Sequence, residues 1–277
     1  MFNMIKMDLY RMFHTKALYV IWIILAAAVF FTTYMSKMEY EWIQEQTEVQ
    51  EQESENLNLG MAVTLPTQPG EEVTVFDQVY ANLQGKFIAL FFMIFTVLFS
   101  SADLGSGYIK NIGGQVKNRT GLILSKAAAL FVFTVLSMLL YLICQTICQG
   151  ICFGSVAWGS IPDSIKYIGV QTCLHYALVL ICMAIAVIVK YNVISMTLSV
   201  CLSMNIMVIL YGFLDKLIEK AGVSDFHVIE HTVTGKIALL SMSADGKEIM
   251  LAVITAAVFA AVAAILTGIV FGRRDIA

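Results

Sequence analysis

The sequence is poor in charged residues and in proline. Asp, Glu, Lys and Arg together make up 13% of its 277 residues, and only 3 residues are proline. A soluble globular domain has about a quarter charged residues, so the composition excludes an ordinary water-soluble protein. Apolar residues make up 59% of the chain instead, and this indicates an integral membrane protein.

No charged residue lies in the middle of any long apolar run. Carriers that are coupled to protons or ions need ionisable side chains at membrane depth, so this absence argues against a proton antiporter. The motif G-x-x-x-x-G-K-[ST] is also absent, and the chain therefore has no phosphate-binding loop of its own. If transport is active, we expect its energy to come from another polypeptide.

The 6 cysteines do not follow the pattern of a disulfide framework. All of them lie in or beside apolar runs, and Cys144, Cys148 and Cys152 share one helix face at steps of four. Because no His or carboxylate joins these three, we interpret them as small buried apolar residues rather than as a soft-metal site.

Six apolar runs predict an all-α integral membrane protein, a single transmembrane domain over residues 1–277, with both termini in the cytoplasm. The expected transmembrane helices cover residues 17–36, 86–101, 127–149, 168–189, 193–214 and 249–271. A helix of about 20 residues spans the roughly 30 Å of hydrocarbon in a bilayer. Residues 1–16 carry apolar side chains at helical spacing, which predicts an amphipathic helix at the membrane interface.

Residues 37–85 form an acidic region that we expect outside the cell. Ten carboxylates lie in it against Lys37 alone. Its first part is expected to continue the first helix outward, and residues 76–84 are expected to form a short helix before the next span. With this orientation ten Lys and Arg lie in cytoplasmic segments and seven outside, as the positive-inside rule favours.

A cationic, glycine-rich stretch, residues 100–126, separates the second and third spans. It carries Lys110, Lys117, Arg119 and Lys126 against a single carboxylate, Asp103. Such a loop stays in the cytoplasm, and its glycines permit sharp bends. We interpret residues 102–126 as a docking surface for a cytoplasmic partner; an ordinary solvated loop that only sets the topology is the alternative.

Three segments of this stretch carry a family resemblance: Gly107-Tyr108-Ile109-Lys110-Asn111-Ile112, Gly114-Gln115-Val116-Lys117-Asn118-Arg119 and Leu124-Ser125-Lys126. They resemble the loop after the second membrane helix of ABC-2 type transporter permeases. Asp103 stands where many members have Glu, and the proline that many members carry before the Arg is absent. The resemblance implies ATPase-coupling roles for Asp103, Gly107, Lys110, Asn111, Gly114, Gln115, Lys117, Asn118 and Arg119.

The same resemblance implies partners. A permease of this kind is a homodimer in the bacterial plasma membrane, and it works with a separate cytoplasmic ATPase that binds ATP and magnesium. We therefore expect no cofactor in this chain, contacts with membrane lipid, and no nucleic-acid partner. The cargo would be an amphipathic peptide, a drug or a similar hydrophobic molecule that is exported.

Two stripes of side chains are candidates for the translocation path. Phe87, Phe91 and Phe95 follow at steps of four in the second span. Ser195, Ser199 and Ser203 form a stripe on the fifth span, with Asn205 beside them. Helix–helix hydrogen bonding is the alternative for the serine stripe, and contact with lipid or plain packing is the alternative for the phenylalanine stripe. The resemblance implies a path near the first, second and fifth helices. The ladder of small residues from Ala252 to Gly272 is instead predicted to pack inside the protomer.

One motif suggests an enzyme. His227-Val228-Ile229-Glu230-His231 fits the H-x-x-E-H pattern of inverted zinc proteases. Only Glu219 or Asp225 is near enough in the sequence to act as a third ligand, and a five-residue pattern with two free positions is weak evidence. A membrane zinc protease is therefore an alternative to the exporter, as is a non-transporting membrane scaffold; we expect no metal site.

Overall fold

The computed structural model describes residues 2–46, 65–67, 71–105, 120–189, 191–204, 206–220 and 226–272. Over these ranges the secondary structure is helical and contains no strand, which confirms the predicted all-α class. The helices are α1 (Phe2–His14), α2 (Lys16–Gln46), α3 (Val75–Gln84), α4 (Phe87–Gly105), α6 (Thr120–Phe153), α7 (Ile161–Val189), α8 (Asn192–Ser203), α9 (Ile206–Lys220), the 3-10 turn η1 (Val228–His231), α10 (Val233–Leu239) and α11 (Gly246–Gly272).

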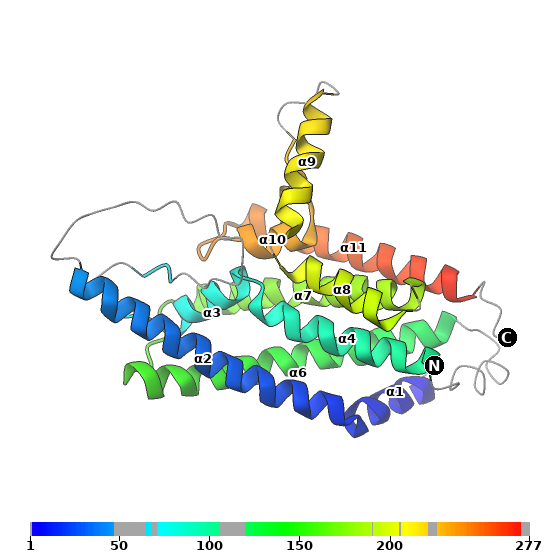
Figure 1. The fold of residues 1–277 in the computed structure, drawn as a ribbon, viewed down its shortest axis with the longest axis horizontal. Coiled ribbons are helices and arrows are strands. Elements are labelled where there is room, and N and C mark those ends of the chain that lie inside the picture. The colour runs from blue at the N-terminus through cyan, green and yellow to red at the C-terminus, as the bar shows by residue number, and fades with distance from the viewer. Residues whose placement is uncertain are drawn as a thin grey trace.

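The long helices run side by side along the longest axis of the molecule (Figure 1). The helices α2, α6, α7 and α11 are each long and apolar enough to cross a membrane. The pairs α3–α4 and α8–α9 pass the same test together, but they are bent by 55° and 75° respectively. The chain thus has four candidate spans, or up to six if each bent pair is one span, and this is consistent with a multi-pass membrane protein.

The helix α3 is the short helix that the sequence predicted before the second span, and it begins one residue earlier than expected. A reciprocal capping box sets its start, because Thr74 Oγ1 accepts from Asp77 N and Asp77 Oδ2 accepts from Thr74 N. Lys86 then separates α3 from α4 with a φ of 57°. A lysine rarely adopts this left-handed conformation, so the bend between the two helices is locally strained.

The region predicted as one helix over residues 193–214 contains two, α8 and α9. In Figure 1, α8 lies along the bundle and α9 projects from its side. The base of α9 is tied down: Tyr211 shares a 2.5 Å hydrogen bond with Thr234, and Asp215 Oδ1 accepts from the backbone N–H of Val228. These contacts join α9 to η1 and α10.

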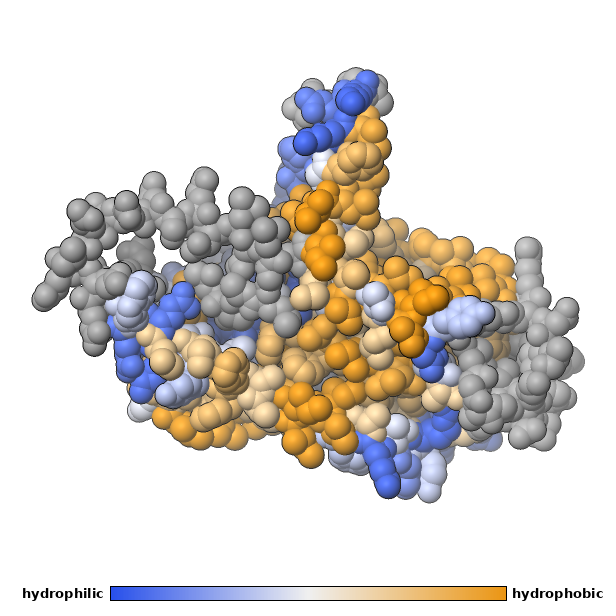
Figure 2. Space-filling view, in the orientation of Figure 1, coloured by the Kyte–Doolittle hydropathy of each residue, from blue (hydrophilic) through white to orange (hydrophobic). Residues whose placement is uncertain are grey.

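The surface of the bundle is apolar, as Figure 2 shows for one face. Large side chains of α11, such as Val258 and Ile265, are exposed, while the small residues Ala252 and Ala256 are buried. A Cβ on Gly268 would lie only 3.1 Å from Thr120 Cγ2 of α6. Ala252, Ala256 and Gly268 of the predicted ladder thus pack inside the chain, whereas Ala260 and Ala264 are half-buried and Gly272 is exposed, so the prediction is confirmed for part of the ladder only.

Candidate functional site

The coupling loop predicted over residues 102–126 overlaps two helices, because α4 continues to Gly105 and α6 begins at Thr120. Asp103 belongs to the last turn of α4, whereas Gly107, Lys110, Asn111, Gly114, Gln115, Lys117, Asn118 and Arg119 lie outside the described residues. Their coupling role stays a prediction. The structure also shows that α1 contacts both helices that flank the loop, α6 through Asp8 and α4 through Arg11.

The first helix is fastened to α6 through a buried carboxylate. Asp8 is 3% exposed, and its Oδ2 accepts a 2.5 Å hydrogen bond from Oγ of the fully buried Ser125. Hydrogen bonds to an ionised acceptor are shorter and stronger than neutral ones. Met12, one turn after Asp8, is buried too. The face of α1 that carries Asp8 and Met12 therefore packs inward against the start of α6.

Two cations complete this site around one aromatic ring of α4. Arg11 Nη1 lies 3.9 Å from Asp8 Oδ1, and its guanidinium lies 5.4 Å from the centroid of the Phe99 ring. Lys126 Nζ lies 5.3 Å from the same centroid. Cations near an aromatic face are attracted to it, more so where water is excluded. We call Asp8, Arg11, Phe99, Ser125 and Lys126 the junction cluster.

The junction cluster joins three helices at one end of the bundle. Asp8 and Arg11 come from α1, Phe99 comes from α4, and Ser125 and Lys126 come from the first two turns of α6. Removing one member of a buried charged set leaves the others uncompensated. The cluster therefore couples the position of α1 to the positions of α4 and α6.

Sequence reasoning missed most of this cluster. Lys126 was assigned to the docking surface for a cytoplasmic partner, and Asp8 was counted only among the cytoplasmic charges. The missed signal is the position of Asp8, three residues after Ile5 and four before Met12, which places it beside the apolar face of α1. A carboxylate in that position needs a buried partner.

The residues predicted for the translocation path are buried inside the chain. Phe95 stacks on Phe133 of α6 with ring centroids 4.2 Å apart, and Phe87 packs edge-on against Phe91 at 5.4 Å. The stripe Ser195, Ser199 and Ser203 is buried on α8, which packs against α4 and α7. Asn205 lies outside the described residues. In this conformation both stripes serve packing, and their role in a path stays a prediction.

The H-x-x-E-H motif does not adopt the geometry of a zinc site. His227 precedes η1 with an extended backbone, φ −110° and ψ 114°, so the two histidines do not share a face of an α-helix as that site requires. His227 Nδ1 lies 3.8 Å from Asp215 Oδ2, and the His231 ring stacks on Phe226. Asp225 lies outside the described ranges, within which no three His, Cys, Asp or Glu side chains come together to bind a metal.

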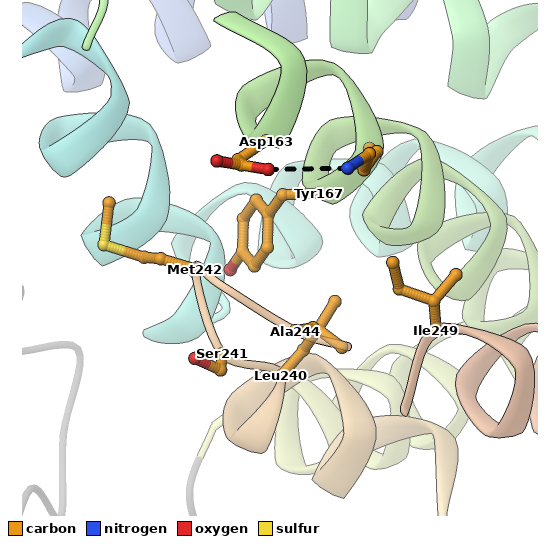
Figure 3. Close-up of a pocket in the computed structure, with 8 residues that line it drawn as sticks. Asp163, Tyr167, Leu240, Ser241, Met242, Ala244 and Ile249 are labelled. Atoms are coloured by element: carbon orange, nitrogen blue, oxygen red, sulfur yellow. Dashed lines mark ion pairs between the residues drawn. The ribbon is translucent and has the colours of Figure 1, made fainter. Parts of the chain in front are cut away.

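Two pockets are lined by residues that do not belong to the junction cluster. Figure 3 shows the smaller, where Asp163 and Tyr167 of α7 face the segment from Leu240 to Ile249. Lys166 Nζ pairs with Asp163 Oδ1 there at 3.6 Å, and the free volume of about 10 Å³ admits about one water molecule. The larger is an open apolar groove of about 360 Å³ between α6 and α11. It is lined by Thr120, Leu124, Ala264, Ile265, Gly268 and Ile269.

Comparison with known families gives one match. The family described as "Protein of unknown function (DUF2705)" matches residues 49–277. Because the match covers most of the chain, the chain belongs to this family. No curated protein matches the sequence.

Proposed function

We propose that this DUF2705 protein is the membrane-embedded permease subunit of an ATP-driven exporter, of the type that the ABC-2 permeases represent. The proposal combines several apolar helices, the absence of a phosphate-binding loop in the sequence, and a cationic segment that resembles the coupling loop of those permeases. The structural observation that carries it is the junction cluster, which joins α1 to the two helices on either side of that segment.

The junction cluster supplies a means of transmission. A cytoplasmic ATPase that binds residues 106–119 would exert force on the end of α4 and the start of α6. Since Ser125 binds Asp8 and both cations face Phe99, α1 would move together with those ends rather than remain at the interface. In the proposed exporter, ATP-driven closure of the ATPase thereby shifts α4 and α6 and changes access to a path between two copies of the chain.

Charge supports export of an amphipathic or cationic cargo. The segments assigned to the outside carry seventeen carboxylates and seven Lys or Arg. A surface of one sign raises the local concentration of ligands of the opposite sign. We place residues 38–84 outside the cell and both termini in the cytoplasm. This orientation puts ten Lys and Arg in cytoplasmic segments and seven outside, as the positive-inside rule favours.

The decisive experiment is charge reversal in the loop. Lys117→Glu combined with Arg119→Glu should abolish co-purification with the ATPase and the cargo-stimulated turnover of ATP in reconstituted vesicles. Truncating one partner of a desolvated charge pair at an interface removes about 2–5 kcal/mol, and reversal should remove at least as much. The control is Lys216→Glu with Lys220→Glu, which makes the same charge change on the exposed α9.

Wild-type co-purification and turnover in the loop variant would show that residues 106–119 only set the topology. Loss of both in the α9 control as well would show a general effect of charge on folding or insertion. Either result would count against the proposed coupling.

A further inference from the structure

The helix α9 carries an apolar face that is exposed in the structure. Large side chains that are each at least 36% exposed make up this face, and they are Ile206, Ile209, Leu210, Phe213, Leu214 and Leu217. With 3.6 residues per turn they fall within an arc of about 140° around the helix. The exposed residues Gly212, Lys216 and Glu219 lie outside this arc. The helix is therefore amphipathic, with an apolar face that is left open.

The direction of α9 differs from that of the candidate spans. It is bent by 75° from α8, and Figure 1 shows it projecting from the side of the bundle, whereas α8 and the long helices follow the longest axis. Because the long helices are the candidate spans, α9 runs along the plane of the membrane rather than through it. An amphipathic helix with this orientation is typical of a membrane interface.

The base of α9 lies where the spans acquire charged residues. Tyr211 is hydrogen-bonded to Thr234 of α10. Leu240, which caps the C-terminal end of α10, lines the pocket of Figure 3 together with Asp163 and Lys166 of α7. Charged side chains are rare within the hydrocarbon and mark where a span leaves it. The base of α9 is therefore near the boundary of the bilayer, on the side that the proposed orientation places outside.

The two faces of α9 are turned as this boundary requires. Figure 2 shows hydrophobic residues on the side of α9 that faces the α1 end of the bundle, and hydrophilic residues at its tip and on the opposite side. In the proposed orientation α1 is cytoplasmic, so the apolar face is turned toward the hydrocarbon and the polar face toward the water outside. In the same view the hydrophobic surface of α9 continues onto the bundle. A second copy or another protein could cover an apolar face in any direction, so this alignment favours lipid.

We propose that α9 is an anchor that lies in the outer leaflet of the membrane, with its apolar face among the acyl chains and with Lys216 and Glu219 at the level of the headgroups. The choice of leaflet rests on the orientation given with the proposed function, whereas binding to a bilayer surface does not. The anchor also holds the elements at its base, because Asp215 accepts a hydrogen bond from Val228 of η1 and α10 packs against α3 and α7.

A scan of spin labels distinguishes a helix in the plane of the membrane from one that crosses it. The native cysteines are replaced by alanine, and the full chain is placed in nanodiscs of phosphatidylglycerol and phosphatidylethanolamine. Electron paramagnetic resonance measures how often each nitroxide collides with oxygen, which is concentrated in hydrocarbon, and with a water-soluble nickel chelate. The single substitutions that carry the label are Ile209→Cys, Phe213→Cys and Leu217→Cys on the apolar face, and Gly212→Cys, Lys216→Cys and Glu219→Cys outside it.

The preference for oxygen should alternate along the sequence. The three labels on the apolar face should favour oxygen over the nickel chelate by at least about threefold relative to the other three, because only that face is immersed in acyl chains. A helix that crosses the membrane would instead change depth steadily, by about 1.5 Å per residue. The labels at Gly212 and Phe213 would then agree.

Polar substitutions test which face binds the bilayer. Phe213→Asn combined with Leu217→Asn should move the label at Ile209 toward the nickel chelate by at least about threefold, because the apolar face is interrupted. Gly212→Asn combined with Glu219→Gln is the matched control on the other face and should leave that label unchanged. If the cysteine-free chain does not fold, the labels are placed in the native chain and the spectrum of the labelled native chain is subtracted.

Three results of the scan would overturn the proposal. A steady change of depth along α9 would make it part of a span. Collision with the nickel chelate at all six positions would show that α9 stays clear of the bilayer. Protection of the apolar face from both reagents would show that a second copy or another protein covers it.

The leaflet is tested separately. Lys216→Cys should react with a membrane-impermeant maleimide in intact cells. If it reacts only after permeabilisation while Gln50→Cys reacts in intact cells, α9 is not in the outer leaflet although the proposed topology stands. Failure of both to react in intact cells would count against the topology itself.

Discussion

Ser125 Oγ lies 2.5 Å from Asp8 Oδ2, and this bond joins residues that are 117 positions apart in the chain. Ser125→Ala should lower the free energy of unfolding by about 1.5–3 kcal/mol, the range for a hydrogen bond to a charged group. Asp8→Ala should cost more, about 3–5 kcal/mol, because it leaves the neighbouring cations without their carboxylate. Thermal or denaturant unfolding in detergent micelles measures both. Glu41→Ala, whose side chain is 60% exposed, is the control; an equal loss in the control would show that the junction cluster contributes no more than a surface carboxylate.

Gly235 is predicted to tolerate no side chain. A Cβ at this position would lie 1.7 Å from the backbone carbonyl oxygen of Ile229, so η1 and α10 would have to separate. Gly235→Ala should destabilise the protein by at least about 2 kcal/mol, as other overpacked sites do. Gly246→Ala at the start of α11 meets nothing within 4 Å and should change stability by less than about 0.5 kcal/mol. Similar melting temperatures for the two variants would contradict this packing.

The close approach of α11 to α6 depends on Gly268. Gly268→Leu should push α11 away from Thr120 and lower stability by about 1–3 kcal/mol. Gly272→Leu, one step further along the same ladder and with no atom within 4 Å of its added Cβ, is the matched control. A cysteine pair at the α6–α11 contact would report the separation through its rate of cross-linking. Unchanged cross-linking in Gly268→Leu would mean that the contact does not need glycine.

The proposed topology predicts the sidedness of two added cysteines. In a variant without the native cysteines, Gln50→Cys should react with a membrane-impermeant maleimide in intact cells. Gln115→Cys should react only after the membrane is permeabilised. The reverse pattern would place the cationic loop outside, where no ATPase could reach it, and the proposed function would fall with it.

His227→Ala is predicted to leave the protein intact. Its side chain is exposed and its Nδ1 lies 3.8 Å from Asp215 Oδ2, so its removal should change stability by less than about 0.5 kcal/mol. Metal analysis of the purified parent chain should find no stoichiometric zinc. Bound zinc that disappears in His227→Ala would revive the protease alternative.

Apolar runs predicted most of the helices, because helix length and hydropathy are local properties of the sequence. The amphipathic helix at the N-terminus and the short helix before the second span both occur, as α1 and α3. The bend between α8 and α9 was missed, since the apolar pattern continues from Ser203 through Ile206 without proline or glycine. Periodicity alone contains no information on whether a continuous apolar run forms one helix or two.

The junction cluster and the buried hydrogen bonds of Gln145 were harder to predict, because both depend on contacts between helices far apart in the sequence. Gln145 could not be paired with Thr33 or Asn82 from spacing. For the phenylalanine stripe, the spacing could be seen in the sequence, but only the structure shows that Phe95 packs on Phe133 inside the chain. Sequence patterns identify faces of helices, and they do not identify what each face meets.

Three polar side chains of α6 find their partners in α1 and α2. Ser125 pairs with Asp8, Ser137 with Trp22 and Gln145 with Thr33. All three partners precede residue 49, where the family match begins. A polypeptide of residues 49–277 would therefore expose one side of α6 with its polar groups unsatisfied. The autonomous folding unit is longer than the region by which the family is recognised, and excision at that boundary should yield a polypeptide that does not reach the native fold.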